Sequence, residues 1–514
     1  MKRIGPWFSL VLIGVAMAAG CMSTGSLYTD IRASRTAAYR QWQREYRTEQ
    51  ASQSTLKGKL SMEDALKLAL VHNKRLQAVI EEKEVARGRV VESYGQALPK
   101  VTAVANYGRL DEAPSFDIEG QSISMGFVNN YSVDLVVTQP VYRGGAISAA
   151  IRAARLGSYL SDESVRGQVQ QTIYEVAKAY YDALLAQHLF VVNEDAVTSA
   201  EVHLEDVKRK RAEGVASEFD VLRAQVDLSN FRAEMIQQQN RIHLSKTTLL
   251  KVMGVSQESD VELAGEFEYE PMKPVLEEAV RLAHENRPDL YQAEIGVRMQ
   301  QEALRIAKSR YWPTVDLTFT QAWARPDPHA SMLDQWGDAW TAGVTGSWPL
   351  FDGFAREGRV IQEKATLKKR NIELLDAQER AAFEAQQAIL SLRDAEEFVE
   401  SQRLSQERAE EGLRLAQVGY REGVNTEVEV ADARAALTRA RGLYYQAVYN
   451  HSLARLELQR AMGILGPRAG ETAGQVKSLP RPSHIEEFAA PKPGDVKPGA
   501  EEKAPQPNDN QGEE

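Results

Sequence analysis

The chain has one cysteine, Cys21, in 514 residues, so it can form no internal disulfide. It has no excess of basic residues either: the formal net charge is -10, which disfavours binding to nucleic acid. After the first twenty residues, no apolar run is long enough for a transmembrane helix. A chain of this kind can span a membrane only as a β-barrel.

Motifs for catalysis and metal binding are also missing. The eight histidines form no HxxxH pair and no cluster with cysteine, so we expect no metal site. No glycine-rich phosphate loop follows a predicted strand. We therefore expect neither an enzyme active site nor a cofactor.

The first residues carry a targeting pattern. Residues 1–20, MKRIGPWFSLVLIGVAMAAG, place two basic residues before an apolar core, which is typical of a cleaved export signal. Cys21 follows directly, and the junction resembles the lipobox at which bacterial lipoproteins are cleaved and acylated. We predict that Cys21 is lipidated and that residues 21–60 form an acylated tether; simple cleavage after small residues is the alternative. Met22 is not the aspartate that retains lipoproteins in the inner membrane, so the outer membrane is favoured.

Most of the remaining chain consists of two similar sequence repeats. Matching segments recur in the same order at offsets of 214 or 209 positions. They are EDALKLA (63–69) with EEAVRLA (277–283), QPVYRGG (139–145) with WPLFDGF (348–354), and EGVASEFDVLRAQVDL (213–228) with EGVNTEVEVADARAAL (422–437). We therefore predict two structural repeats, 61–267 and 268–465. The Pro/Glu/Lys-rich tail, 466–514, has little to bury and is predicted to be disordered.

Each repeat has the pattern of a helix, two strands and two helices. The first helices, about 62–96 and 275–310, end just before a proline. Proline-free stretches rich in Ala, Glu, Gln, Leu and Arg then predict helices over about 146–210 and 354–421. At 1.5 Å per residue each is about 100 Å long, which is too long for a compact domain and suggests a tunnel wall. The return helices carry an apolar stripe spaced alternately three and four apart, which favours packing against neighbouring helices.

Four segments alternate between apolar residues and Thr, Ser or Asp, which predicts strands. They lie at about 100–109, 129–139, 314–325 and 338–348. Tryptophans and tyrosines gather near their ends, as in the interfacial girdles of membrane barrels. A half-buried hairpin outside a membrane would give the same alternation. Four strands cannot close a barrel, for which about eight is the minimum, so a barrel requires oligomerisation.

The lipobox, the duplicated plan, the prolines at the strand borders and the motif G-x-x-[ST]-x-x-[DE]-V together resemble the TolC family of outer membrane efflux proteins. The resemblance implies a mainly α fold with a β portion. Three protomers would share a twelve-stranded barrel in the lipid of the outer membrane, continued by a long periplasmic α-helical barrel. It also implies a passive channel of a tripartite efflux or type I secretion system, docked to a periplasmic adaptor and an inner-membrane pump.

In that family the tunnel tip lies where each long helix turns into its return helix. The turn residues here are Gly214, Val215, Gly423 and Val424, which the resemblance assigns to adaptor docking. It assigns the closed gate to Tyr420 and to the acids Asp220, Glu429 and Asp432. Two residues depart from the family pattern: Glu429 stands where the family often has aspartate, and Arg223, the counterpart of Asp432 in the first repeat, can pair with these acids. Acids in the first turn of a helix also stabilise the helix dipole, and Ser217 and Thr426 suit N-caps, so a structural role is equally open.

One other function shares several of these features. A periplasmic coiled-coil adaptor or structural lipoprotein without a pore would also have long helices and a lipid anchor. It would not need two pairs of alternating strands with tryptophan girdles. The sequence therefore favours the channel.

Overall fold

The computed structural model describes residues 38–39, 43, 57–118, 121–124, 126–267, 269–330 and 332–466. All of them fall within one compact unit, Met1–Thr472. The predicted signal, Cys21, most of the predicted tether and the tail beyond residue 466 lie outside the described residues.

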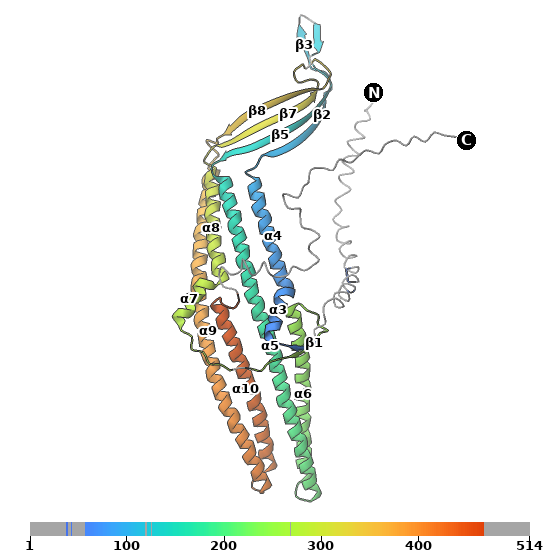
Figure 1. Ribbon diagram of the computed structural model, residues 1–514, viewed down its shortest axis with the longest axis vertical. Coiled ribbons are helices and arrows are strands. Elements are labelled where there is room, and N and C mark those ends of the chain that lie inside the picture. The colour runs from blue at the N-terminus through green and yellow to red at the C-terminus, as the bar shows by residue number, and fades with distance from the viewer. Residues whose placement is uncertain are drawn as a thin grey trace, which may run out of the picture. The chain divides into compact units, whose positions relative to one another are not determined.

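Four antiparallel strands form one sheet above the helices (Figure 1). Their spatial order is β2(Lys100–Arg109), β5(Asn129–Arg143), β7(Thr314–Arg325), β8(Gly337–Ser347). Each repeat supplies two strands, and the repeats meet where β5 pairs with β7. β5 runs further than expected because a bulge between Pro140 and Tyr142 accommodates the proline, which has no N–H for the ladder. β2 and β8 remain as open edges.

The register puts apolar and polar residues on opposite faces of the sheet. Ala105, Val133 and Trp323 lie directly opposite one another in successive strands and share the apolar face. A row on the other face consists of Thr102, Val136, Thr320 and Thr341. Cross-strand partners share a face, so the sheet has one mainly apolar face and one mainly polar face. Val136 on the polar face and Asp338, which pairs with Trp323 on the apolar face, are exceptions.

Two long helices descend from the sheet (Figure 1). They are α5(Ala146–Ala212) and α9(Ala355–Arg421), each of 67 residues. Each turns into a return helix, α6(Glu218–Met253) or α10(Glu427–Ala461), and packs along it. These elements, together with the strand pairs, confirm the duplicated plan of strand pair and helix pair.

The helix that opens each repeat is broken in two, so the expectation of single helices over 62–96 and 275–310 was wrong. In the first repeat, α3(Met62–His72) ends at Asn73, whose backbone is extended and whose side chain accepts a hydrogen bond from Leu76 N, capping α4(Lys74–Gly95). In the second, α7(Leu276–Asn286) ends at Arg287, because the next residue, Pro288, disfavours a helical conformation there and starts α8(Pro288–Ser309).

At each break the end of a return helix meets the start of an upper helix. Asn73 Nδ2 donates to Val252 O at 2.8 Å, which joins α4 to the end of α6. At the second break, Arg287 Nη1 donates to Ala461 O of α10 at 3.5 Å, and Gln170 Nε2 of α5 donates to Gly463 O at 2.7 Å, just after α10. A Cβ on Gly463 would lie 2.7 Å from Arg287 N, so only glycine fits this approach. Each return helix therefore stacks end to end beneath an upper helix.

Short strands beside the helices were not predicted. β1(Lys57–Leu60) pairs in parallel with β6(Asp260–Leu263), although the tether was expected to continue to residue 60. Tyr180 OH donates to the carbonyl oxygens of Leu60 (3.1 Å) and Ala264 (2.5 Å) and fixes this pair to α5. A further hairpin, β3(Ser115–Ile118) with β4(Gln121–Ser124), belongs to the connection that leads along the chain from β2 to β5. Among the described residues, no helix combines the length and the apolar character needed to cross a membrane.

Candidate functional site at the two helical turns

The two turns between long and return helices have the same geometry. After α5, Gly214 takes a φ of 77° and Val215 N donates to Lys210 O at 2.8 Å. After α9, Gly423 takes a φ of 75° and Val424 N donates to Gly419 O at 2.8 Å. Glycine suits both positions, because it has no Cβ and takes the left-handed backbone conformation that ends a helix without strain. Val215 and Val424 are 76% and 79% exposed, so each turn presents one apolar side chain.

The acid at the third position of each return helix closes a capping box. Asp220 Oδ2 accepts from Ser217 N at 2.8 Å, and Ser217 Oγ accepts from Asp220 N at 3.2 Å. Glu429 Oε2 accepts from Thr426 N at 2.7 Å in the same arrangement. Hydrogen bonds from the Ser217 backbone and hydroxyl lower the pKa of Asp220. Both carboxylates therefore start a return helix, which is the structural role left open by the sequence.

Tyr420 contacts a different acid from those that the resemblance implied. It lies in the last turn of α9 next to Glu427, the first residue of α10. Burial and the Glu427 carboxylate raise the pKa of Tyr420 to about 12. Lys210 Nζ of α5 lies 3.6 Å from the centre of the Tyr420 ring, a cation–π contact between the first helical hairpin and the second.

Glu427 and its partners are site residues that the sequence did not reveal. Glu427 is only 8% exposed, and one of its carboxylate oxygens contacts His203 Nε2 of α5. Arg434 lies further along α10 and is 5% exposed. Burial lowers its pKa, although the carboxylates of Glu427 and Asp227 act in the opposite direction. A buried carboxylate needs a charged or hydrogen-bonding partner. His203 is 224 positions away, so no local pattern could have indicated the pair.

Asp432 and Arg223 form the one contact among the expected gate residues that joins the two hairpins. Arg223 Nη2 lies 3.9 Å from Asp432 Oδ1, between α6 and α10. The Asp432 side chain is 75% exposed, so solvent screens this pair and its contribution to stability is about 0–1 kcal/mol. Of the three acids assigned to the gate, Asp432 is thus the one whose carboxylate does not close a cap.

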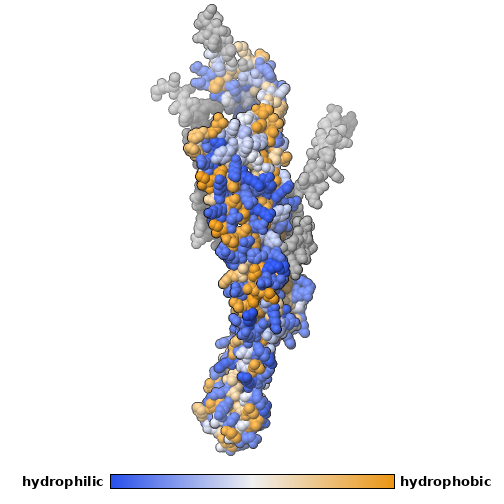
Figure 2. All heavy atoms as spheres, turned by 90° about the vertical axis from the view of Figure 1, so that its left-hand side faces the viewer, coloured by the Kyte–Doolittle hydropathy of each residue, from blue (hydrophilic) through white to orange (hydrophobic). Residues whose placement is uncertain are grey.

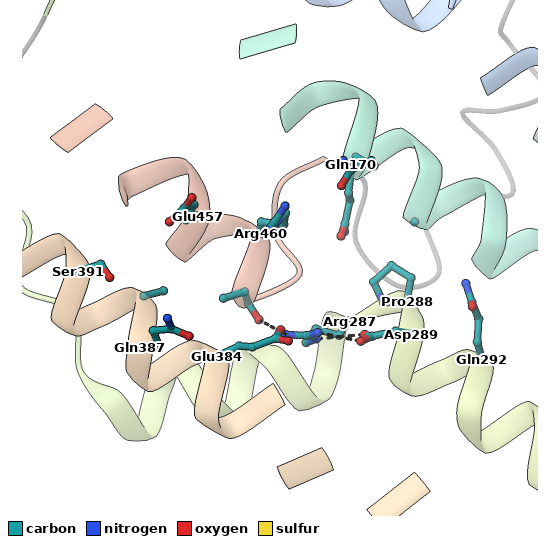
Figure 3. A pocket seen from close by; sticks show the side chains of 14 residues that line it. Gln170, Arg287, Pro288, Asp289, Gln292, Glu384, Gln387, Ser391, Glu457 and Arg460 are labelled. Atoms are coloured by element: carbon teal, nitrogen blue, oxygen red, sulfur yellow. Dashed lines mark hydrogen bonds and ion pairs between the residues drawn. The ribbon is translucent and has the colours of Figure 1, made fainter. Parts of the chain in front are cut away.

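A second polar region lies at the joint between α10 and α8 (Figure 3). It is a hollow lined by charged and amide side chains from α5, α8, α9 and α10. Arg287 donates to Asp289 at 2.7 Å and to Glu384 at 2.5 Å (Figure 3). Burial opposes ionisation of Asp289, but its bonds with Arg287 prevail and lower its pKa. Glu457 and Arg460 are both engaged by Tyr174, so each charged group here has a partner within the chain. We assign this hollow to the joint.

Comparison with known proteins agrees with this architecture. The chain belongs to the outer membrane efflux protein family, whose model matches residues 65–255 and 279–464. It is 22% identical to the probable efflux pump outer membrane protein TtgC of Pseudomonas putida, over 78% of this chain and 83% of that protein. It is also 22% identical to the alkaline protease secretion protein AprF of Pseudomonas aeruginosa, over 79% and 85%.

Solved structures show the same fold. The Campylobacter jejuni CmeC outer membrane channel superposes with a TM-score of 0.70 at 16% identity, covering 81% of this chain and 88% of that one. The open state of the Neisseria gonorrhoeae MtrE outer membrane channel gives 0.66 at 17% identity, covering 78% and 89%. The family predicted from the sequence is confirmed, and the protein is an outer-membrane channel component with a large periplasmic portion. The adaptor without a pore is thereby excluded.

Proposed function

We propose that three copies of this chain form one channel, which receives substrates from a periplasmic adaptor and an inner-membrane pump and conducts them outward unchanged. Energy comes from the pump, so the chain itself needs no catalytic centre. One relative is named as an efflux pump protein and another for secretion of a protease, and the proposal covers both kinds of system. The observation that carries it is the pair of open strand edges.

β2 and β8 each leave a row of backbone N–H and C=O groups without a partner strand in the described chain. They are ten and eleven residues long, and an open edge of this length is a template for pairing with another chain. If β2 of one copy pairs with β8 of the next, three four-stranded sheets close into a barrel of twelve strands. The apolar sheet face would then meet lipid and the Thr-rich face would line the lumen.

The helices also leave apolar stripes uncovered in the single chain. On α6 the exposed members are Phe219, Leu222, Val226, Ile236 and Leu244. On α9 they include Ile372, Leu375, Phe383 and Leu390. The side of the molecule that is left in Figure 1, where α9 lies, shows apolar patches among hydrophilic side chains in Figure 2. We expect α6 of one copy to pack against α9 of the next, as their spacing favours.

At the two turns we assign docking and gating to different residues. The exposed Val215 and Val424, with Gly214 and Gly423, form the surface for the adaptor. Asp432 would occur three times around the tip, near enough for mutual repulsion unless Arg223 or a cation compensates. The contacts of Glu427 with His203 and Tyr420 would hold the second hairpin against α5 in the closed channel.

Disulfide cross-linking of the sheet edges tests the trimer. In a Cys21→Ser background, Ala103→Cys in β2 is combined with Ala342→Cys or Val344→Cys in β8. Oxidation of membranes should give a covalent trimer, because each copy is linked to two neighbours. Ala103→Cys with Leu135→Cys is the matched control, since these residues are paired within one chain and should give only monomer. Monomer from all edge combinations would contradict the proposal.

A further inference from the structure

The loop from β8 into α9 contains a strained residue. Phe354 has a φ of 68°, and it is the one non-glycine residue with positive φ among the described parts of the chain. Its counterpart in the first repeat is Gly145, at φ 85°. A bulky residue held in this region costs about 1–3 kcal/mol, and such strain persists where the side chain serves a function. The second repeat thus holds a phenylalanine where glycine would be unstrained.

Contacts inside the chain do not explain this phenylalanine. Phe354 is 70% exposed, and its neighbours Leu350 and Phe351 are 79% and 76% exposed. The rings of Phe351 and Phe354 meet edge to face at 5.6 Å. We call Leu350, Phe351 and Phe354 the apolar prong. Covering one such side chain is worth about 1.5–3 kcal/mol, so a partner surface would more than offset the strain.

The prong is held on a rigid loop. Arg356 N and Nε donate to Asp352 Oδ2 at 3.1 and 2.9 Å. The Arg356 guanidinium also donates to the carbonyl oxygens of Pro349 (2.7 Å) and Leu350 (3.2 Å) and lies 5.1 Å from the Tyr311 ring centre. Two carbonyl oxygens of the loop and the amide of Arg356 are therefore paired within it, while its apolar side chains are exposed. Preorganisation of this kind lowers the entropic cost of inserting the prong into an apolar medium.

The prong continues the apolar face of the sheet. Trp348 lies four residues beyond Val344, on the same face by alternation, and is 60% exposed. Its indole N–H donates to Tyr311 O at 3.1 Å, so the exposed ring has no unsatisfied donor. Trp312 beside it is 58% exposed. Tryptophan and tyrosine favour the boundary between lipid and water, which places this border of strand and helix at a membrane surface.

We infer that the apolar prong inserts into the periplasmic leaflet of the outer membrane and binds lipid acyl chains below the barrel. This rests on the proposed barrel, whose lipid-facing side the prong extends. The three prongs of a trimer would anchor the start of each α9 to the membrane. A second copy of the chain is the other surface that could cover these side chains, and the experiment separates the two.

Fluorescence quenching measures the environment of the prong directly. Phe351→Cys, Val344→Cys and Val215→Cys are each made in Cys21→Ser protein, labelled with an environment-sensitive fluorophore and reconstituted into phosphatidylethanolamine/phosphatidylglycerol vesicles. A nitroxide lipid labelled near its headgroup should quench the label at 351 about as strongly as the strand control at 344. The turn control at 215 should be quenched by aqueous iodide instead.

Three results would overturn the inference. Iodide quenching at 351 would place the prong in water. Protection at 351 from both quenchers, with cross-linking to Leu98→Cys of another copy, would place it at a protomer interface. A label at 344 that lipid does not quench would contradict the barrel itself. Failure of the proposed function is therefore distinguishable from failure of the inference about the prong.

A strain-free variant separates local structure from lipid contact. Phe354→Gly restores the residue found in the first repeat, so the loop should fold at least as stably in detergent. In vesicles, the label at 351 should lose part of its quenching by lipid, because the neighbouring apolar side chain of the prong, Phe354, is gone. Equal lipid quenching with and without Phe354 would contradict a role for this residue in the prong.

Discussion

Glu427 is the residue at the turns on which most of the buried polar contacts depend. It follows the N-cap Thr426 directly, as many solvated first-turn acids do, yet it is buried between His203 of α5 and Tyr420 of α9. Because these partners come from α5 and α9, Glu427 couples the second hairpin to the first. A surface acid in the same turn would stabilise only its own helix.

Removing this carboxylate should loosen the second turn. In Glu427→Ala, His203 and the buried Arg434 lose their acidic neighbour, and an unsatisfied buried group costs about 1–3 kcal/mol. We expect faster hydrogen exchange of the amides at 428–434, together with more frequent openings in planar bilayers. Glu422→Ala changes an exposed acid at the end of α9 and serves as control. Equal hydrogen-exchange rates in the two variants would show that the Glu427 contacts do not stabilise the turn.

Asp220 should make the start of α6 sensitive to acid. Its pKa is lowered below the ordinary 3.8 by hydrogen bonds from Ser217, so the folded form favours the ionised carboxylate. The resulting stability is present above the ordinary pKa and is lost as the pH falls below it. The cap is worth about 0.5–2 kcal/mol. We expect exchange protection at 218–221, corrected for intrinsic rates, to exceed that of Asp220→Asn at pH 6 and to converge with it near pH 3.

Local motifs predicted some of these residues and necessarily missed others. Ser217 with Asp220, and Thr426 with Glu429, are three positions apart, so their capping boxes are readable from the sequence. The partner of Tyr420 is not readable in this way. The resemblance pointed to Asp220, Glu429 and Asp432, but Asp220 and Glu429 close capping boxes and Asp432 lies near Arg223. Burial of Glu427 depends on how α5 and α10 pack, which no local spacing encodes.

At the scale of elements, the joints between stacked helices are the most constrained positions. Gly463 has a φ of 70°, and an added Cβ would lie 2.7 Å from backbone atoms of Asn286 and Arg287. Gly463→Ala should therefore destabilise the protein by more than about 1 kcal/mol. Gly412→Ala is the matched control, because this exposed site within α9 is open and has no positive φ. There we expect stabilisation of about 0.5–1 kcal/mol. Thermal unfolding in detergent measures the stability of both variants. A more stable Gly463→Ala protein would contradict the close approach of Gly463 to Asn286 and Arg287.

The elements divide clearly into those that periodicity predicts and those that it does not. Alternation gave the four sheet strands and proline-free composition gave α5 and α9, because both patterns extend over many residues. The breaks at Asn73 and Arg287 interrupt otherwise helical sequences and arise where another helix end must fit. β1 and β6 have four residues each and pair across some 200 positions, so neither segment carries enough pattern to be recognised.

For the whole molecule, we predict two separate attachments to the membrane, the lipid on Cys21 and the barrel. We expect Cys21→Ser protein to stay in the membrane fraction through washes with urea and carbonate and to require detergent for extraction, because the barrel alone holds it. Release as a monomer without detergent would leave the acyl chain as the sole anchor and would contradict the barrel. The parent protein, treated in parallel, is the control.

The unbroken helices also restrict how the chain can change in length. α5 and α9 each run for 67 residues from the sheet to a turn, and one inserted residue would rotate everything below it by about 100°. A single insertion in either helix would therefore turn the gate residues away from their partners. The stacked helices beside α5 and α9 are divided at Asn73 and Arg287. A segment inserted at either break need not rotate the helix above it relative to the helix below it, because no continuous helix joins the two. Because α5 and α9 are continuous, a longer tunnel requires matched additions of about two turns to both of them and to the helices beside them.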